Sequence, residues 1–417
     1  MSELIPVGWQ ERSLASLGDY INGFAFNDEH WSELGLPIVR IAQITGSQGI
    51  VDRFLGLLPD AYRLEDGDLI FSWSGTLAVV RWLGGSAWLN QHLFKVFSRR
   101  DIDKTFLFHL LQQSVAEMNK RTHGSTMKHI KRGELEEFVV AVPVDLTEQA
   151  QVAAVLDSLD TAIHQTEAIV EKLKQVKQGL LHDLLTRGVD ANGELRPSYE
   201  DAPHLYQDSK LGWIPRDWTV GSLSANCSEV VDCPHSTPVF TDAGVLVART
   251  MHIKDGVFLE GQASRVSEKQ YRERVARLTP EPGDVIFTRE APVGEAFVIP
   301  YGMKICLGQR VMLLRPRLNV LSAHFLLAQI YSGAVHERIG TLTSGTTNPH
   351  LNVAEVRDFM IPLPQYVEQI TIGERISAVS DRLSKEVCEL SKLKLQKTGL
   401  MDDLLTGRVR VTPLLGQ

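Results

Sequence analysis

The chain has 417 residues, of which 43% are hydrophobic and 23% are charged, a composition that suits a soluble protein of two or three domains. Its formal net charge of −8 excludes a general binder of polyanions, because unspecific affinity for nucleic acid needs a basic surface. Any contact with nucleic acid must therefore be local, or be assisted by a more basic partner. No apolar run approaches the roughly 18 residues of a membrane span, and the start MSELIPVGWQ lacks a secretory signal, so we expect a cytoplasmic protein without a membrane partner.

Residues 1–144 predict a first globular domain of α+β pattern. Short strand-like runs alternate with turns and precede one helical stretch, without the regular alternation of parallel βαβ units. The strand-like runs are residues 36–44, 67–73 and 87–98, and the helical stretch is residues 103–120. A glycine-bearing loop, a basic segment and a strand that stops at Pro143 complete the domain.

Residues 145–187 predict one long helix with the apolar seam of a coiled coil. Its apolar residues recur in steps of three and four, and Thr166 and Lys177 fill the two slots that would interrupt the seam. Asp145 and Glu148 have the spacing of a capping box at the helix start. The seam consists of Val152, Leu156, Leu159, Ile163, Val170, Leu173, Lys177, Leu180 and Leu184.

The second half of the chain repeats the first. Residues 188–215 form a polar connector, residues 216–365 follow the order of the first domain with different loop residues, and residues 408–417 are a tail. The helix of residues 366–407 aligns with the first one without a gap, and both begin at Glu-Gln and end on Gly-Leu-x-x-Asp-Leu-Leu-Thr. Glu386 matches Thr166, and the second seam consists of Ile372, Ile376, Val379, Leu383, Leu390, Leu393, Lys397, Leu400 and Leu404.

Two matched seams in one chain favour pairing of the two helices with each other. A single seam would suit a plain helical core equally well, but the gapless second copy argues against that alternative. At about 40 residues each and about 1.5 Å per residue, the helices are rods of roughly 60 Å, too long for the core of one compact domain. We expect the order globule, rod, globule, rod, with the rods acting as a spacer.

No motif for catalysis or metal binding stands out, so we expect no catalytic residue and no metal. The chain lacks GxxxxGK[ST], GxGxxG, HExxH and GxSxG patterns, and Asn348-Pro349 precedes His350 rather than the Pro-aromatic pair of amino-methyltransferases. Its four cysteines include no Cys-x-x-Cys pair, which suits reduced thiols. A zinc site at Cys227, Cys233 and His235 is a minor alternative.

The order and duplication of these features resemble the DNA-specificity subunit of type I restriction-modification systems over essentially the whole chain. The resemblance rests on two variable globules, matched helices after Pro-ended strands (VAVPVDLTEQ and IPLPQYVEQ), the shared helix endings, and the strands GDLIF and GDVIF. It implies two target-recognition domains, related by a pseudo-two-fold axis and held apart by an antiparallel coiled coil. Each domain would read one half of a bipartite, asymmetric site in double-stranded DNA.

The resemblance also implies partners. Two methyltransferase subunits would dock on the helix pair, and restriction subunits would join through them. S-adenosyl-methionine, ATP and Mg are then expected in those partner subunits, with no cofactor in this chain.

Candidate DNA contacts come mainly from one basic stretch, which contains no acid. Its candidate residues are Lys120, Arg121, His123, Ser125, Thr126, Lys128, Lys131 and Arg132, and a solvated surface run is the alternative. The matching stretch of the second domain has lost the charge and offers hydrogen bonds from Ser344, Thr346, Thr347 and Asn348.

Further candidates follow the predicted strands, where Arg, Gln and Asn could pair with base edges. They are Ser72, Trp73, Ser74, Thr76, Asn90, Gln91 and His92 in the first domain, and Arg249, Arg289, Gln309 and Arg310 in the second. Some of these residues would serve equally well as plain turn residues.

Two other function classes compete with this interpretation. One is an enzyme in which a globule carries methyltransferase or nuclease chemistry by itself, and S-adenosyl-methionine binding by the purified chain would support it. The other is an adaptor whose globules bind proteins, which a lack of sequence-specific DNA protection alongside a methyltransferase would favour.

Overall fold

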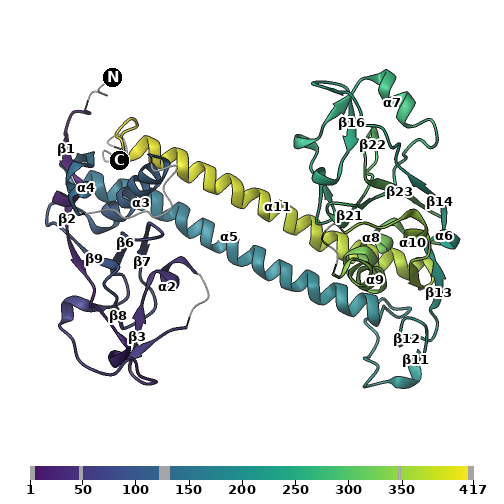
Figure 1. Cartoon of the computed structure of the whole chain (residues 1–417), viewed down its shortest axis with the longest axis horizontal. Coiled ribbons are helices and arrows are strands. Elements are labelled where there is room, and N and C mark those ends of the chain that lie inside the picture. The colour runs from purple at the N-terminus through teal and green to yellow at the C-terminus, as the bar shows by residue number, and fades with distance from the viewer. Residues whose placement is uncertain (1–4, 47–49, 122–131, 346, 348, 412–417) are drawn as a thin grey trace. The chain divides into compact units, whose positions relative to one another are not determined.

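The structure is a computed structural model that describes residues 5–46, 50–121, 132–345, 347 and 349–411 (Figure 1). Two compact units divide the chain, one of Met1–Glu167 with Cys388–Gln417 and one of Ala168–Val387. The division falls within both long helices, α5 (Leu146–Thr186) and α11 (Tyr366–Leu404), so each helix contributes a part to each unit. Within the described residues, no helix combines the length and hydropathy needed to cross a lipid bilayer.

The first unit contains two four-stranded sheets, ordered β2-β9-β6-β7 and β4-β3-β8-β5, and the two-stranded pair β1-β10. Its strands are β1 (Trp9–Ser13), β2 (Gly18–Asn22), β3 (Leu36–Val39), β4 (Arg53–Phe54), β5 (Arg63–Leu64), β6 (Leu69–Ser72), β7 (Ala78–Arg81), β8 (Ala87–Leu89), β9 (Leu93–Ser98) and β10 (Val139–Pro143). Its shorter helices are α1 (Leu14–Leu17), α2 (Ile41–Thr45), α3 (Lys104–Arg121) and α4 (Arg132–Glu137).

The second unit contains the four-stranded sheets β14-β23-β20-β21 and β15-β19-β16-β22 and three two-stranded pairs, β11-β12, β13-β24 and β17-β18. Its strands are β11 (Tyr206–Gln207), β12 (Ile214–Pro215), β13 (Thr219–Ser222), β14 (Cys227–Asp232), β15 (Phe240–Thr241), β16 (Val245–Ala248), β17 (Ile253–Lys254), β18 (Val257–Phe258), β19 (Arg265–Val266), β20 (Val285–Arg289), β21 (Val293–Val298), β22 (Ile305–Leu307), β23 (Val311–Pro316) and β24 (Met360–Leu363). Its shorter helices are α6 (Leu223–Asn226), α7 (Glu268–Arg274), α8 (Ala323–Tyr331), α9 (Ala334–Thr343) and α10 (Val353–Arg357).

The two units repeat the topology of their first four-stranded sheet, whereas the strand order of the second sheet differs between them. In each, the strand after a Gly-Asp turn, β6 or β20, lies second from the edge of an antiparallel sheet and is fully buried up to its last residue. Each unit also contains one parallel strand pair in its second sheet, β3 with β8 and β16 with β22. The mixed helix and sheet character expected from the sequence is therefore confirmed.

Two expected strands of the first domain are shorter than predicted. The run of residues 36–44 ends as a strand at Val39, because helix α2 starts at Ile41 and closes on Gly46 in the left-handed region at φ 72°. The run of residues 87–98 splits into β8 and β9 around a turn at Asn90. Alternating side chains alone do not mark such interruptions.

Every predicted seam residue of the long helices is buried or half-buried. In the first unit, Lys397 and Lys394 of α11 make ion pairs of 2.6 and 2.7 Å with Asp160 and Glu167 of α5. In the second unit, apolar side chains of both helices join the same buried cluster, among them Leu181, Leu184, Ile372 and Ile376. The seam therefore faces partner side chains within each unit.

The Glu-Gln pair at the start of each long helix joins the helix to its globule. Gln149 accepts from the Asp103 N–H at 2.7 Å and donates to the Pro143 carbonyl at 2.9 Å. Gln369 does the same, accepting from the Ser322 N–H at 2.9 Å and donating to the Pro364 carbonyl at 2.9 Å. A buried amide can thus satisfy both of its polar atoms, which explains why both helices start with the same two residues.

The capping box predicted for Asp145 and Glu148 is wrong. Asp145 does cap, accepting from the Thr147 N–H at 2.9 Å, but the Glu148 carboxylate accepts from the Arg410 guanidinium at 2.6 and 2.8 Å. Its counterpart Glu368 likewise accepts from Arg196 at 2.5 and 3.1 Å. A charge-assisted pair is stronger than a bond to one backbone N–H, so the distant arginines win.

A charged network in the first unit ties α3 and β7 to both long helices. Asp157 accepts from the Arg81 guanidinium at 3.0 and 3.2 Å and lies 2.8 Å from His109 Nε2. Asp160 lies 2.6 Å from Lys397 Nζ, which also donates to Gln112 of α3 at 3.2 Å. The network joins segments that lie far apart in the sequence, so it orients the globule on the rods.

We expect Lys397→Met to destabilise the first unit by about 2 kcal/mol, because it leaves the largely buried Asp160 carboxylate without its cation. Lys394→Met is the matched control, since its pair with Glu167 is exposed and such pairs contribute about 0–1 kcal/mol. Peptide-resolved hydrogen exchange over residues 104–121 measures the difference. Equal exchange in the two variants would contradict an orienting role for the network.

Candidate nucleic-acid interface

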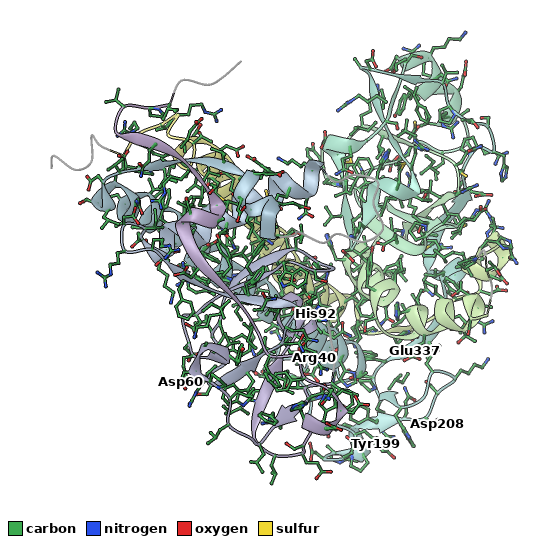
Figure 2. All side chains as sticks on the ribbon, turned by 60° about the vertical axis from the view of Figure 1, so that its left-hand side comes forward. Arg40, Asp60, His92, Tyr199, Asp208 and Glu337 are labelled. Atoms are coloured by element: carbon green, nitrogen blue, oxygen red, sulfur yellow. The ribbon has the colours of Figure 1, made fainter. Side chains whose placement is uncertain are left out.

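In the first unit, three segments meet at one end of the sheets, and two of them, after β6 and after β8, contain candidates predicted from the sequence. The Asn90 N–H donates to the Val39 carbonyl at 3.1 Å, which sets the β8–β9 turn beside Arg40. The rings of Trp73 and His92 lie 6.2 Å apart, which sets the segment after β6 beside the same turn. Figure 2 shows Arg40 and His92 on this part of the unit. The ends of β3, β6 and β8 therefore form one continuous surface.

Burial separates the candidates of this surface into two groups. Ser72, Ser74 and Asn90 are buried, so they hold the turns in place: Asn90 Oδ1, for example, accepts from the His92 N–H at 3.3 Å. Thr76 and His92 are exposed, and Trp73 and Gln91 are half-buried. The second group is the one that a ligand can touch in this conformation.

The second unit builds the same surface from corresponding segments. The Gly308 N–H donates to the Ala248 carbonyl at 2.7 Å, which brings the β22–β23 turn beside Arg249. The Arg289 N–H donates to the Arg310 carbonyl at 3.0 Å, which brings the end of β20 to the same turn. The ends of β16, β20 and β22 thus match those of β3, β6 and β8.

Arg289 and Arg310 differ in what they can do. The Arg289 guanidinium lies on Asp232 at 3.0 and 3.3 Å, and its side chain is 12% exposed. Arg310 occupies the left-handed region at φ 67°, is 57% exposed, and lies 3.3 Å from Glu290. The first arginine is held inside by its acid, whereas the second points into solvent and can exchange its exposed acid for another anion.

Arg249 and Gln309 complete this surface. The Arg249 guanidinium lies 5.0 Å from the centre of the Phe240 ring and donates to Ser264 at 3.4 Å. Gln309 donates to the His235 carbonyl at 3.4 Å and is half-buried. These contacts orient both side chains at the edge of the surface formed by the ends of β16, β20 and β22.

Most of the basic stretch lies outside the described residues. Lys120 is exposed at the end of α3, Arg121 and Arg132 belong to α3 and α4, and Ser344 and Thr347 are exposed after α9. The structure does not describe His123, Ser125, Thr126, Lys128, Lys131, Thr346 and Asn348. The Glu290–His350 bridge places the segment after α9 beside Arg310.

Sequence reasoning missed Arg40, which follows β3 as Arg249 follows β16. Arg40 pairs with Asp52 and lies 5.8 Å from the centre of the Trp31 ring. The signal was present, because LPIVRIAQI and VLVARTMHI place an arginine at the same step after matching strands. Arg40 becomes a candidate only when β3 and β16 are known to end at corresponding surfaces of their units.

The described residues contain one cluster with the ligands for a cation, and it lies elsewhere. His109, Asp157 and Asp160 have ligand atoms within 4.8 Å of one another. Arg81 and Lys397 already neutralise both carboxylates, which makes a third cation there unfavourable. Cys227, Cys233 and His235 form no such group, and burial raises the pKa of the Cys227 thiol to about 12, which opposes the thiolate that zinc requires.

The chain is similar to proteins of a known family. A family model described as "Type I restriction modification DNA specificity domain" matches residues 6–175 and 258–392, well over half of the chain. The chain belongs to this family. It is 24% identical over 383 residues to the Type I restriction enzyme MjaVIII specificity subunit of Methanocaldococcus jannaschii, covering 88% of this chain and 84% of that protein.

Further relatives agree. The Type I restriction enzyme EcoBI specificity subunit of Escherichia coli is 23% identical over 399 residues, covering 91% of this chain and 81% of that protein. Among solved structures, the S subunit of a Type-I restriction-modification system from M. genitalium superposes with a TM-score of 0.65 at 14% identity, covering 97% of both chains. The fold of this family member is therefore that of a specificity subunit.

Substitution of Arg289 and of Arg310 should affect stability to different degrees. We expect Arg289→Ala to lower the free energy of unfolding of the second unit by about 1–3 kcal/mol, because the half-hidden Asp232 carboxylate loses its guanidinium. Arg310→Ala should change it by less than about 0.5 kcal/mol, as usual for an exposed side chain. Scanning calorimetry tests both predictions. A larger loss of unfolding free energy in Arg310→Ala than in Arg289→Ala would show that Arg310 has a structural role.

Proposed function

We propose that this chain is the DNA-recognition subunit of a type I restriction-modification complex, in which each globule reads one half of a bipartite, asymmetric site. The observation that carries the proposal is the duplication. The topology of one four-stranded sheet occurs twice in a family of specificity subunits, and at matching positions of the strand ends Arg289 and Arg310 of the second unit stand where the first unit has Trp73 and His92. Different linings on one frame suit two different half-sites.

Catalysis belongs to partner subunits in this proposal. The relatives are named specificity subunits. Two methyltransferase subunits would dock on this chain and restriction subunits would join through them. S-adenosyl-methionine, ATP and Mg would then bind in the partners and not in this chain.

The long helices would set the distance between the half-sites. We propose that α5 and α11 pair as an antiparallel coiled coil along their whole length, with the globules related by a pseudo-two-fold axis. Partial pairing inside each unit supports this, as do the matched seams. A pseudo-symmetric reader suits half-sites about one DNA turn, roughly 34 Å, apart.

Base contacts would come from exposed polar side chains at the strand ends, with Arg310, Gln309 and His92 as the leading candidates. Arginine and glutamine can pair in a bidentate manner with guanine and adenine edges. The undescribed stretch of residues 122–131 would contact phosphates. The net charge of −8 leaves much of the phosphate neutralisation to the partners.

Exchange of residues 1–144 for the corresponding domain of a relative tests the proposal. We expect one half of the methylated site to change and the other half to stay, because each unit has its own surface and core. Sequencing that detects methylated adenine in a host with the whole system reads the outcome.

Exchange of residues 216–365 is the matched control and should change only the other half. Loss of both halves in a chain that still assembles would contradict separate readers. Absence of any sequence-dependent methylation in the native system would instead favour an adaptor.

Insertion of seven residues after both Glu167 and Val387 tests the spacer. Both points lie where the compact units divide, and a heptad keeps the seam in phase. At about 1.5 Å per residue the insertion separates the units by roughly 10 Å, or about three base pairs. We expect unchanged half-sites with a longer spacer, whereas a four-residue insertion, which rotates the seam, should be tolerated less well. A spacer of unchanged length with full activity would mean that the globules, and not the helices, set the register.

A further inference from the structure

The two units can be compared residue by residue around the long helices. The helix N-caps Asp103 and Ser322 each donate their N–H to the glutamine of a Glu-Gln pair, which aligns α3 with α8. Strand registers align β7 with β21, because Arg81 lies opposite the first residue of β6 and Val298 opposite the first residue of β20. Figure 1 shows α8 and β21 beside the parts of α5 and α11 in the second unit.

This comparison shows that the charged network of the first unit is missing from the second. Uncharged residues replace its other members, and only the lysine remains. Val298 replaces Arg81, Ala328 replaces His109, Tyr331 replaces Gln112, Ser377 replaces Asp157, Ser380 replaces Asp160, and Lys177 matches Lys397.

A cavity of about 200 Å³ occupies the vacated place, and the five replacement residues and Lys177 all line it. This volume equals roughly seven water molecules at about 30 Å³ each, and it is smaller than the sites of drug-sized ligands. Its floor includes the buried Leu181, Ala328 and Ile376. The cavity therefore results from specific replacements and not from loose packing.

Lys177 lacks the carboxylate that its counterpart holds. Lys397 lies 2.6 Å from Asp160, whereas the half-buried Lys177 ammonium forms no hydrogen bond or ion pair with the described part of the chain. Burial lowers its pKa, and the fields of Asp255 and Glu295 act in the opposite direction. The Glu295 carboxylate is already engaged, because it accepts from the Tyr331 hydroxyl at 2.7 Å and the Asp255 N–H at 2.8 Å.

The polar side chains that line the cavity form two groups, half-buried donors and exposed acids. Lys177, Ser377 and Ser380 are half-buried and offer an ammonium and two hydroxyls, which suits a carboxylate. Asp255 and Asp381 line the same cavity but are exposed, so they lie at its mouth, where they suit an ammonium group. A ligand with both charges satisfies both sets without adding net charge.

We propose that this cavity binds a small zwitterion of the α-amino-acid class, with its carboxylate on Lys177, Ser377 and Ser380 and its ammonium toward Asp255 and Asp381. In the first unit, Asp160 supplies the carboxylate from within the chain. In the second unit, the ligand supplies it. Occupancy would then tie the β17–β18 turn, through Asp255, to both long helices, so the ligand would stiffen the attachment of the second globule.

Titration calorimetry of the full chain with L-glutamine and L-methionine tests the proposal, with butyrate and butylamine as analogues that carry one charge each. We expect both amino acids to bind and both analogues to bind at least about tenfold more weakly, as the loss of one charge-assisted contact implies. Lys177→Met should weaken binding of the amino acids by about tenfold or more. Lys394→Met, an exposed lysine on the same helix pair, should leave binding unchanged.

Ser380→Asp gives an independent test, because it restores the acid of the first unit opposite Lys177. We expect it to abolish amino-acid binding and to raise the melting temperature in the absence of ligand. Asp255→Asn serves as a second variant at an exposed position, where folding is not at risk, and should weaken the amino acids but not butyrate.

Absence of binding by the native chain at millimolar amino acid would overturn the proposal, as would unchanged affinity in Lys177→Met. Butyrate that binds as tightly as L-glutamine would overturn the assignment of a zwitterion. Binding in Ser380→Asp equal to that of the native chain would place the ligand outside the cavity.

Discussion

A carboxylate at the start of each long helix joins that helix to the segment that follows the other long helix. Glu148 and Glu368 each accept from an arginine that lies beyond the end of the other long helix, and each also accepts from an indole N–H, of Trp9 at 3.4 Å and of Trp218 at 3.2 Å. The positive end of the helix dipole favours the same charge. Removing one partner from such a buried pair costs about 3–5 kcal/mol, so the junction tolerates little change. Together with the neighbouring glutamines, it fixes how each helix leaves its globule.

The repeated frame lets the two halves differ where they need to. Around the helices, the first unit fills a space with Arg81, Asp157 and Lys397, and the second leaves a cavity beside Lys177. At the strand ends, the first unit shows His92 and the second shows Arg310. Duplication preserves the buried junctions because their bonds are mutually dependent, while side chains that face solvent or a cavity change without cost to the core.

The arginines at the strand ends of the two units are paired with other side chains. Arg40, Arg289 and Arg310 each lie beside an acid, and Arg249 lies over an aromatic ring. Such pairing orients the guanidinium groups and suppresses attraction to arbitrary polyanions, so a surface of this kind discriminates more than it attracts. The net charge of −8 agrees with the proposal that other subunits supply much of the attraction to the DNA backbone.

The sequence by itself determined the long helices, the strands after the Gly-Asp turns and the duplication, because periodicity and turn residues act over a few positions. It also singled out the segments at Trp73 and Asn90, which meet in the first unit, and those at Arg289 and Arg310, which meet in the second. Only the tertiary structure decided which of those side chains are open, since Ser72 and Asn90 are buried by strands from elsewhere in the chain. It also decided that Glu148 pairs with Arg410, 262 positions away, and does not form a capping box. The cavity beside Lys177 likewise became visible only in the structure. Contacts between residues so far apart depend on packing, and no local pattern records them.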